Sequence, residues 1–120
     1  MELSIQEVRE GITLITLDGG LDSATLRSLR EGIDQLLGAG RCRIILDCAK
    51  LTYVSSAGIG AIVSLHRRVQ ETGGQLWIAG ATGAVFEVLK LMNLGSILNL
   101  SDDVELATEA MGPTRDGAAG

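Results

Sequence analysis

The sequence predicts an α/β fold: a single domain with a four- to five-stranded mixed sheet packed with about four helices. Short apolar stretches of strand length alternate with stretches whose apolar residues recur at the three- and four-residue spacing of a helix. The 120 residues suffice for one domain with its own core. Aromatic residues make up only 2% of the chain, so this core must consist of Leu, Ile, Val and Ala.

The charge balance narrows the classes of partner. The formal net charge is −5, and a surplus of Lys and Arg for contacts with phosphates is missing, so no nucleic acid is expected as a partner. No stretch reaches the roughly 18 to 20 apolar residues that span a bilayer, and the N-terminal MELSIQEVRE is charged where a signal peptide is apolar. We therefore expect a cytoplasmic protein with no membrane partner.

The N-terminal third predicts a hairpin followed by a helix. Alternating apolar residues over 3–8 and 12–17 indicate two antiparallel strands around a turn at Glu10-Gly11. After Gly19-Gly20, Asp22 is the predicted N-cap of a helix. The apolar face of this helix comprises Leu26, Leu29, Ile33, Leu36 and Leu37, and Gly38 to Gly40 end it.

The central third predicts a buried strand, a loop and a helix. The continuous apolar run within Arg43–Asp47 indicates a parallel central strand covered on both faces. A short polar connection leads to Ser55-Ser56, where a helix with inward Ile59, Ile62, Val63, Leu65 and Val69 begins. Gly58 and Gly60 each cost this helix up to about 1 kcal/mol relative to Ala. Either close helix–sheet packing or the close approach of a partner explains them.

The last third predicts a strand at Gln75–Ala79 and a helix that buries Val85, Val88, Leu89 and Met92. Asn93 breaks that helix, a short strand follows over 97–100, and Ser101-Asp102-Asp103 caps a final helix through Met111. We therefore assign residues 1–111 to the domain and 112–120 to a disordered C-terminal tail.

The two serines lie at the start of the central helix, where negative charge is favoured, but the sequence places no general base beside them. A nucleophilic serine needs a base, and His66, the single histidine, lies about 15 Å further along the same helix. Flanked by arginines, His66 is interpreted as solvent-exposed. Cys42 and Cys48 lack neighbours that would complete a zinc site or a disulfide framework. We expect no enzymatic activity, no metal and no cofactor.

Several stretches together resemble a known family. They are Leu21-Asp22, Leu46-Asp47, LTYVSSAGIG at 51–60 and FEVLKLMNLGSILNLSDDVELATEAM at 86–111. Their order is similar to that in the STAS domain of bacterial anti-sigma factor antagonists, and the resemblance covers about residues 3–111. It implies a phosphoprotein that regulates transcription by partner switching. The unmodified form binds an anti-sigma factor that is also a serine kinase, phosphorylation ends the binding, and a PP2C-type serine phosphatase restores it.

The resemblance also implies site residues. The family's phosphoacceptor corresponds to Ser56, with Ser55 as the alternative, and Ser55 stands where many members carry Asp. Gly20 stands where the family often has an acidic residue before Leu-Asp. The implied partner-binding set is Asp22, Ser55, Ser56, Gly58, Ile59 and Gly60.

Two other functions remain open from the sequence. The chain can be a non-enzymatic STAS subunit of a larger assembly, such as a lipid-transport complex or a stress-sensing scaffold. Binding of a small molecule or nucleotide is the third possibility, since α/β folds often bind such ligands. As an anti-sigma factor antagonist, a small acidic domain of this type is expected to work as a monomer.

Overall fold

The computed structural model of the protein describes residues 2–9 and 11–112 and confirms the predicted fold class. The elements in chain order are β1 (Glu2–Arg9), β2 (Ile12–Leu21), α1 (Ser23–Gly38), β3 (Arg43–Val54), α2 (Ser56–Glu71), β4 (Gln75–Ala79), α3 (Gly83–Leu91), the 3₁₀ turn η1 (Leu94–Ser96), β5 (Asn99–Ser101) and α4 (Val104–Met111). Of the predicted tail at 112–120, residues 113–120 lie outside the described residues.

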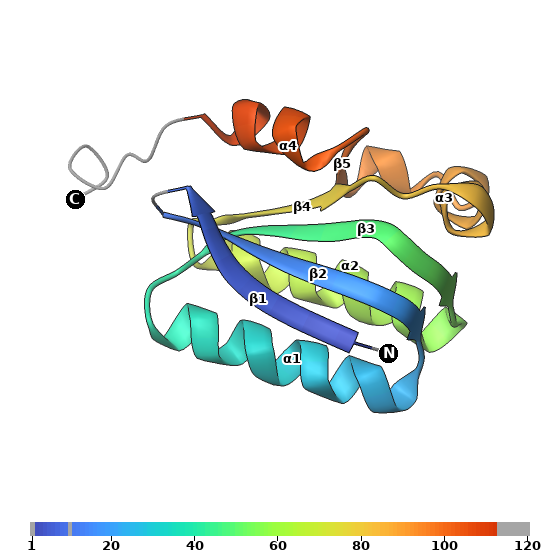
Figure 1. The fold of residues 1–120 in the computed structure, drawn as a ribbon, viewed down its shortest axis with the longest axis horizontal. Helices are drawn as coiled ribbons and strands as arrows, with labels where there is room; N and C mark the ends of the chain where they lie inside the picture. The colour runs from blue at the N-terminus through green and yellow to red at the C-terminus, as the bar shows by residue number, and fades with distance from the viewer. Residues whose placement is uncertain (1, 10, 113–120) are drawn as a thin grey trace.

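The sheet has the mixed topology that the hairpin and the central strand predicted. Its strand order is β1-β2-β3-β4-β5; β1 pairs antiparallel with β2, and the other neighbours are parallel. Because β2 and β3 are parallel, they end at the same edge of the sheet, and the helices that follow them, α1 and α2, begin there. Figure 1 shows α1 and α2 on one face of the sheet and α4 on the other.

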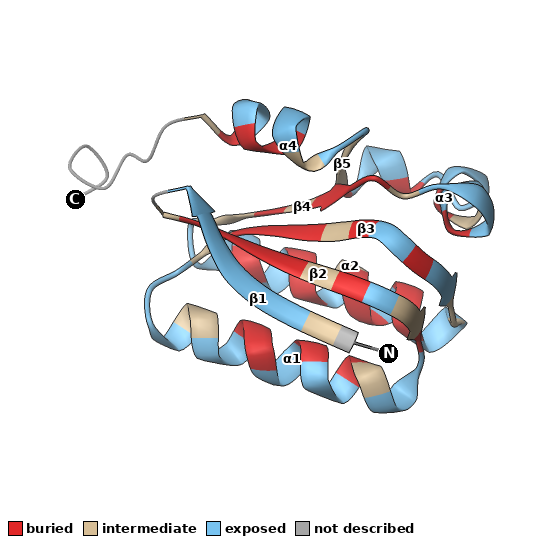
Figure 2. Ribbon diagram, in the orientation of Figure 1, coloured by how far each residue is buried: buried red, intermediate tan, exposed pale blue. Residues whose placement is uncertain are grey.

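Two apolar layers hold the helices to the sheet. The larger lies between α1, α2 and the sheet and includes the fully buried Leu17, Leu29, Ile44 and Val69. The smaller lies under α4 and joins Ile12 and Ile45 to Met111 and other residues. Figure 2 shows the buried residues concentrated on β2, β3 and β4, while β1 is largely exposed.

Three expectations about individual elements are wrong. The central strand does not end at Asp47 but continues to Val54, because the polar stretch stays paired with the end of β2. Exposed Lys50 and Thr52 alternate with buried Leu51 there and hide the strand from a search for continuous apolar residues. Met92 is 54% exposed rather than buried, and the last strand begins at Asn99, two residues later than predicted.

Candidate functional site

The edge where β2 and β3 end brings the predicted site residues together. Leu21 and Val54 are paired neighbours on these strands, and the backbone N–H of Ser55 donates to the carbonyl of Leu21 over 3.1 Å. Asp22 directly follows β2, and Ser55 directly follows β3, its paired neighbour. They are the N-caps of α1 and α2, which start side by side.

Ser55 and Ser56 have different roles at the start of α2. Ser55 has an extended backbone, and its hydroxyl accepts a hydrogen bond from the N–H of Gly58 over 3.0 Å, so Ser55 is the N-cap of α2. Ser56 is the first helical residue, is exposed, and its hydroxyl makes no hydrogen bond with any described residue. Ser55 is thus committed to the fold, and the Ser56 hydroxyl is open to an approaching protein.

Gly58 and Gly60 in the first turns of α2 differ in whether close helix–sheet packing explains them. A Cβ at Gly58 would lie 2.8 Å from Cγ2 of Val54 and 3.1 Å from the carbonyl oxygen of Leu21. This glycine is required for close packing of the helix start against the strand ends. A Cβ at Gly60 would meet nothing within 4 Å, so the fold does not demand a glycine there.

Asp22 closes the start of α1. Its carboxylate accepts hydrogen bonds from the backbone N–H groups of Ala24 and Thr25, and the Asp22 N–H donates to the Thr25 hydroxyl oxygen, forming a capping box. The Thr25 N–H that donates to the carboxylate holds the pKa of Asp22 below its usual value. Asp22 lies beside the serines, but within the described residues it makes no hydrogen bond to either of them.

Not every residue implied by the resemblance reaches the surface. Ile59 is 5% exposed and belongs to the core layer under α2, and Gly58 is also buried. Of the implied set, Asp22, Ser56 and Gly60 are exposed and Ser55 is half-buried. A partner that binds here would contact these three and reach Ile59 only indirectly.

His66 is not solvent-exposed, as its flanking arginines suggested, but is 3% exposed on the buried side of α2. Its Nδ1 atom has no hydrogen-bond partner in the described part of the chain. The imidazole is turned inward while the Ser56 hydroxyl faces outward, and the two are about 15 Å apart along the helix. The geometry therefore gives Ser56 no base from this histidine.

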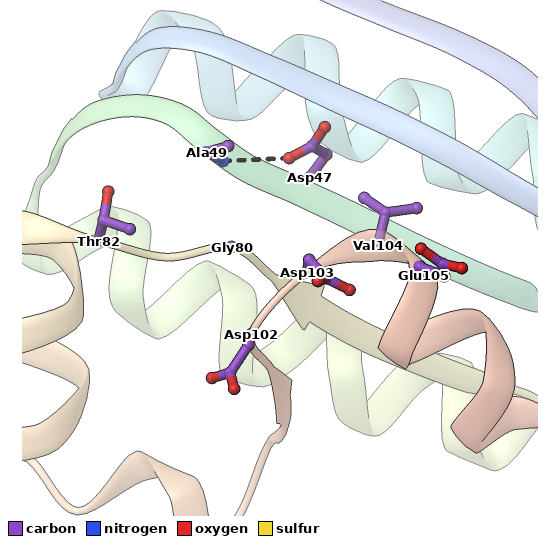
Figure 3. Close-up of a pocket in the computed structure, with 8 residues that line it drawn as sticks. All are labelled: Asp47, Ala49, Gly80, Thr82, Asp102, Asp103, Val104 and Glu105. Carbon is purple, nitrogen blue, oxygen red and sulfur yellow. Dashed lines mark hydrogen bonds between the residues drawn. The ribbon is translucent and has the colours of Figure 1, made fainter.

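The cysteines and acidic residues do not form a recognisable metal site. Both thiols are free, and burial raises the pKa of Cys48 to about 12. A cavity of about 480 Å³ on the α4 side of the sheet is lined by Asp47, Asp102, Asp103, Glu105 and four uncharged residues (Figure 3). Asp47 accepts from the Ala49 N–H and Asp103 caps α4, so these two carboxylates already have structural roles. Among residues 2–9 and 11–112, no cluster of His, Cys, Asp and Glu is suited to a metal ion.

Two arginines near the site have no signal in the sequence. Arg27 and Arg30 on α1 line a cavity together with Ala57, the residue that follows Ser56. Only the packing of α1 beside α2 places them there, so no local spacing in the chain marks them.

Comparison with known proteins places this geometry in a family. The family model of the STAS domain matches residues 5–107. The anti-sigma F factor antagonist of Paenibacillus polymyxa is 27% identical over 112 residues, which cover 91% of this chain and 96% of that protein.

Solved structures share the fold. The structure of TM1081 from Thermotoga maritima has a TM-score of 0.84 at 20% identity and covers 92% of this chain and 95% of its own. The anti-sigma factor antagonist SpoIIAA in its unphosphorylated form has a TM-score of 0.71 at 20% identity, with 99% of both chains covered. At these identities the likeness establishes the architecture. No helix in the described part of the protein has the length and hydropathy to cross a membrane.

Proposed function

The chain belongs to the STAS-domain family, and we propose that it is an anti-sigma factor antagonist that works by partner switching. In its unmodified form it binds an anti-sigma factor that is also a serine kinase. Phosphorylation of Ser56 ends that binding, and a PP2C-type serine phosphatase reverses the modification. The domain itself is a binding module without catalytic activity and acts in the cytoplasm as a monomer.

The observation that carries this proposal is the division of roles between the two serines. Ser55 is held by its bond to the Gly58 N–H, whereas the Ser56 hydroxyl is exposed and unbonded among the described residues. A kinase needs a hydroxyl that it can reach without unfolding the helix, and Ser56 meets this condition. The name of the Paenibacillus relative and the existence of SpoIIAA in unphosphorylated and phosphorylated forms support the same assignment.

The modification is a phosphoryl transfer from ATP to Ser56. The hydroxyl oxygen bonds to the γ-phosphorus, the bond from that phosphorus to the bridging oxygen breaks, and ADP leaves. The hydroxyl proton passes to a base that the kinase supplies, because the domain offers none at this position. The residues of the domain present the acceptor, and the kinase provides the chemistry.

A phosphate at this position would act mainly on the interface. It adds a charge of about −1.5 to −2 beside Asp22 and Gly60, where a close partner would lie, and brings repulsion and a desolvation cost. A loss of about 3 to 4 kcal/mol lowers affinity by roughly two to three orders of magnitude. The start of a helix tolerates negative charge, so the fold of the free domain stays nearly unchanged.

The test is a binding measurement with a cognate kinase-type anti-sigma factor. Ser56→Ala should retain the partner, and Ser56→Asp should lose it. Ser64→Asp adds the same charge at an exposed serine two turns along α2 and serves as the matched control. Incubation with ATP should add one phosphate to wild type and none to Ser56→Ala. Equal binding by the Ser56→Ala and Ser56→Asp variants would refute the switch.

One feature favours the alternative function as a non-enzymatic subunit of a larger assembly. Four large apolar side chains around α3 and η1 are at least 44% exposed, namely Phe86, Leu91, Met92 and Ile97. Such exposure suits a surface covered by another protein. The alternative predicts neither phosphorylation of Ser56 nor binding of a kinase-type partner, so the experiment above also separates the two functions.

A further inference from the structure

A cavity of about 340 Å³ lies in the groove between the first halves of α1 and α2. Its walls are Ser23, Leu26, Arg27, Arg30 and Glu31 of α1 and Ala57 of α2. Ala57 directly follows Ser56, so the cavity opens next to the proposed phosphoacceptor. Nothing in the proposed function above uses this groove.

The register of the two helices places Arg27 within reach of Ser56, and Arg30 lines the same cavity from about one turn further along α1. Further along the groove Arg68 of α2 forms an ion pair with Asp34 of α1, so side chains meet across it. Asp34 and Arg68 are separated by 34 positions, as are Ser23 and Ala57 in the cavity wall. The same offset puts Arg27 four residues, or about 6 Å, beyond the level of Ala57, a distance that a long arginine side chain can span. Arg30 lies about 10.5 Å beyond that level and contributes its charge from the far end of the cavity.

Two arginine side chains in the cavity wall have no acidic partner within the described residues. Arg41 and Arg68 have carboxylate partners, but Arg27 and Arg30 make no hydrogen bond or ion pair with any residue in the described ranges. Glu31 contributes one negative charge, which leaves a net positive charge in the wall.

The start of α2 adds to this attraction for an anion. Its first turn contains no acidic residue, and the Ser55 cap satisfies the Gly58 N–H. The N–H groups of Ser56 and Ala57, in the first turn of the helix, are left without a partner in residues 2–9 and 11–112. The groove and the helix start therefore present two guanidinium groups and two amides to the same small region.

We propose that Arg27 and Arg30 bind the phosphate of phosphorylated Ser56, so that the groove between α1 and α2 receives the modification within the same molecule. The inference rests on the proposed function because it takes Ser56 as the acceptor. A phosphate offers three acceptor oxygens, and a planar guanidinium binds two of them at once. Attachment to the neighbouring residue gives the phosphate a high effective concentration at this site.

The binding would change what the surface offers to a partner. In the unmodified protein the two arginines of the cavity beside the acceptor are free to meet an acidic group of a partner. After modification the phosphate neutralises them and occupies the groove. The switch would then act by removing a favourable contact and filling the groove, and only the part of the phosphate charge that the arginines leave uncompensated would repel a partner. The backbone would not rearrange.

The test measures the second pKa of the Ser56 phosphate by ³¹P NMR. Phosphoserine is incorporated genetically at position 56, so no kinase is needed. The ordinary value is about 6, and paired guanidinium groups stabilise the dianion. We expect the pKa in otherwise wild-type protein to be lower by about 0.5 units or more than in the Arg27→Gln/Arg30→Gln variant. Arg27→Lys/Arg30→Lys should restore part of the shift.

The matched control is Arg9→Gln/Arg67→Gln, which removes the same charge from two exposed arginines outside the groove. It should leave the phosphate pKa within about 0.2 units of wild type, because distant surface charges are screened. An equal shift in the control, or none in the Arg27→Gln/Arg30→Gln variant, overturns the proposal. Loss of the anti-sigma partner by that variant with an unchanged phosphate pKa would assign the groove to the partner instead. Because the phosphate is installed without a kinase, this result is independent of the binding test for the proposed function.

Discussion

The starts of α1 and α2 occupy equivalent places in the fold, but side chains cap more of the free backbone N–H groups at α1 than at α2. Each helix follows a parallel strand, and the two strands are paired at their last residues. At α1 the Asp22 carboxylate accepts two backbone N–H groups and forms a capping box with Thr25. At α2 Ser55 accepts one N–H, and the next residue, Ser56, exposes a free hydroxyl in the described structure. One start is closed by its own side chains, and the other is left open.

The difference is also one of charge. Asp22 places a carboxylate at the positive end of the α1 dipole, whereas the cap and the first turn of α2 carry no acid. A phosphate on Ser56 would supply the negative charge that α2 lacks. In the proposed function, phosphorylation would complete a helix start that carries no acidic cap, and a large charge could therefore be added without disturbing the fold.

The largest expected effect separates the two glycines of the open start. Gly58→Ala should destabilise the protein by about 1 to 3 kcal/mol, because the new methyl group would press on Val54 and the Leu21 carbonyl. Gly60→Ala is the matched control and should stabilise it by up to about 1 kcal/mol, since its methyl group meets nothing and alanine favours the helix. Urea unfolding of both variants measures the difference. Equal stabilities would show that the two positions are not distinct.

The buried faces of the two helices provide the next prediction. The buried residues of α1 are Leu26, Leu29, Gly32 and Ile33, whereas α2 buries His66 with an unpartnered Nδ1 among the described residues. A buried polar atom without a hydrogen bond costs about 1 to 3 kcal/mol. His66→Leu should therefore raise the free energy of unfolding by about 1 kcal/mol in thermal or urea denaturation. A clear loss of stability would instead reveal an interaction that the imidazole makes in solution.

These cases show what a sequence can and cannot predict. The elements, the sheet class and the Asp22 cap follow from local patterns: apolar spacing, glycine breaks, and an aspartate just before its helix. The pattern at Ser55-Ser56 marks a helix start but does not say which serine caps it. The burial of His66 does not, because the neighbouring Arg67 and Arg68 point away on the exposed side and mask the orientation of a single residue.

The site shows the same limit. Local spacing identified Gly58 and Gly60 as unusual but could not assign a cause to either, since the cause depends on atoms of β2 and β3. The positions of Arg27 and Arg30 depend on the packing of one helix beside another. Features formed by two distant segments therefore remain hidden until the fold is known.

A smaller effect distinguishes the two serines. Ser55→Ala removes the cap bond to the Gly58 N–H and should cost about 1 kcal/mol. Ser56→Ala should change the stability by less than about 0.5 kcal/mol, since its hydroxyl has no partner in the described residues. Thermal unfolding of both variants checks this order. A larger cost at Ser56 would mean that its hydroxyl supports the helix and is less available to a kinase.

The smallest expected effect concerns the closed start and depends on pH. Because the pKa of Asp22 is lowered in the folded protein, its charge adds stability above the unfolded value of about 3.9, and this stability is lost as the pH falls through the folded pKa. Wild type should have a higher melting temperature than Asp22→Asn at pH 7, and the gap should close below pH 3.9. Asp18→Asn, an exposed neighbour on β2, controls for net charge. A gap that is constant with pH would show that the charge of Asp22 contributes nothing, and the electrostatic contrast between the two helix starts would fail.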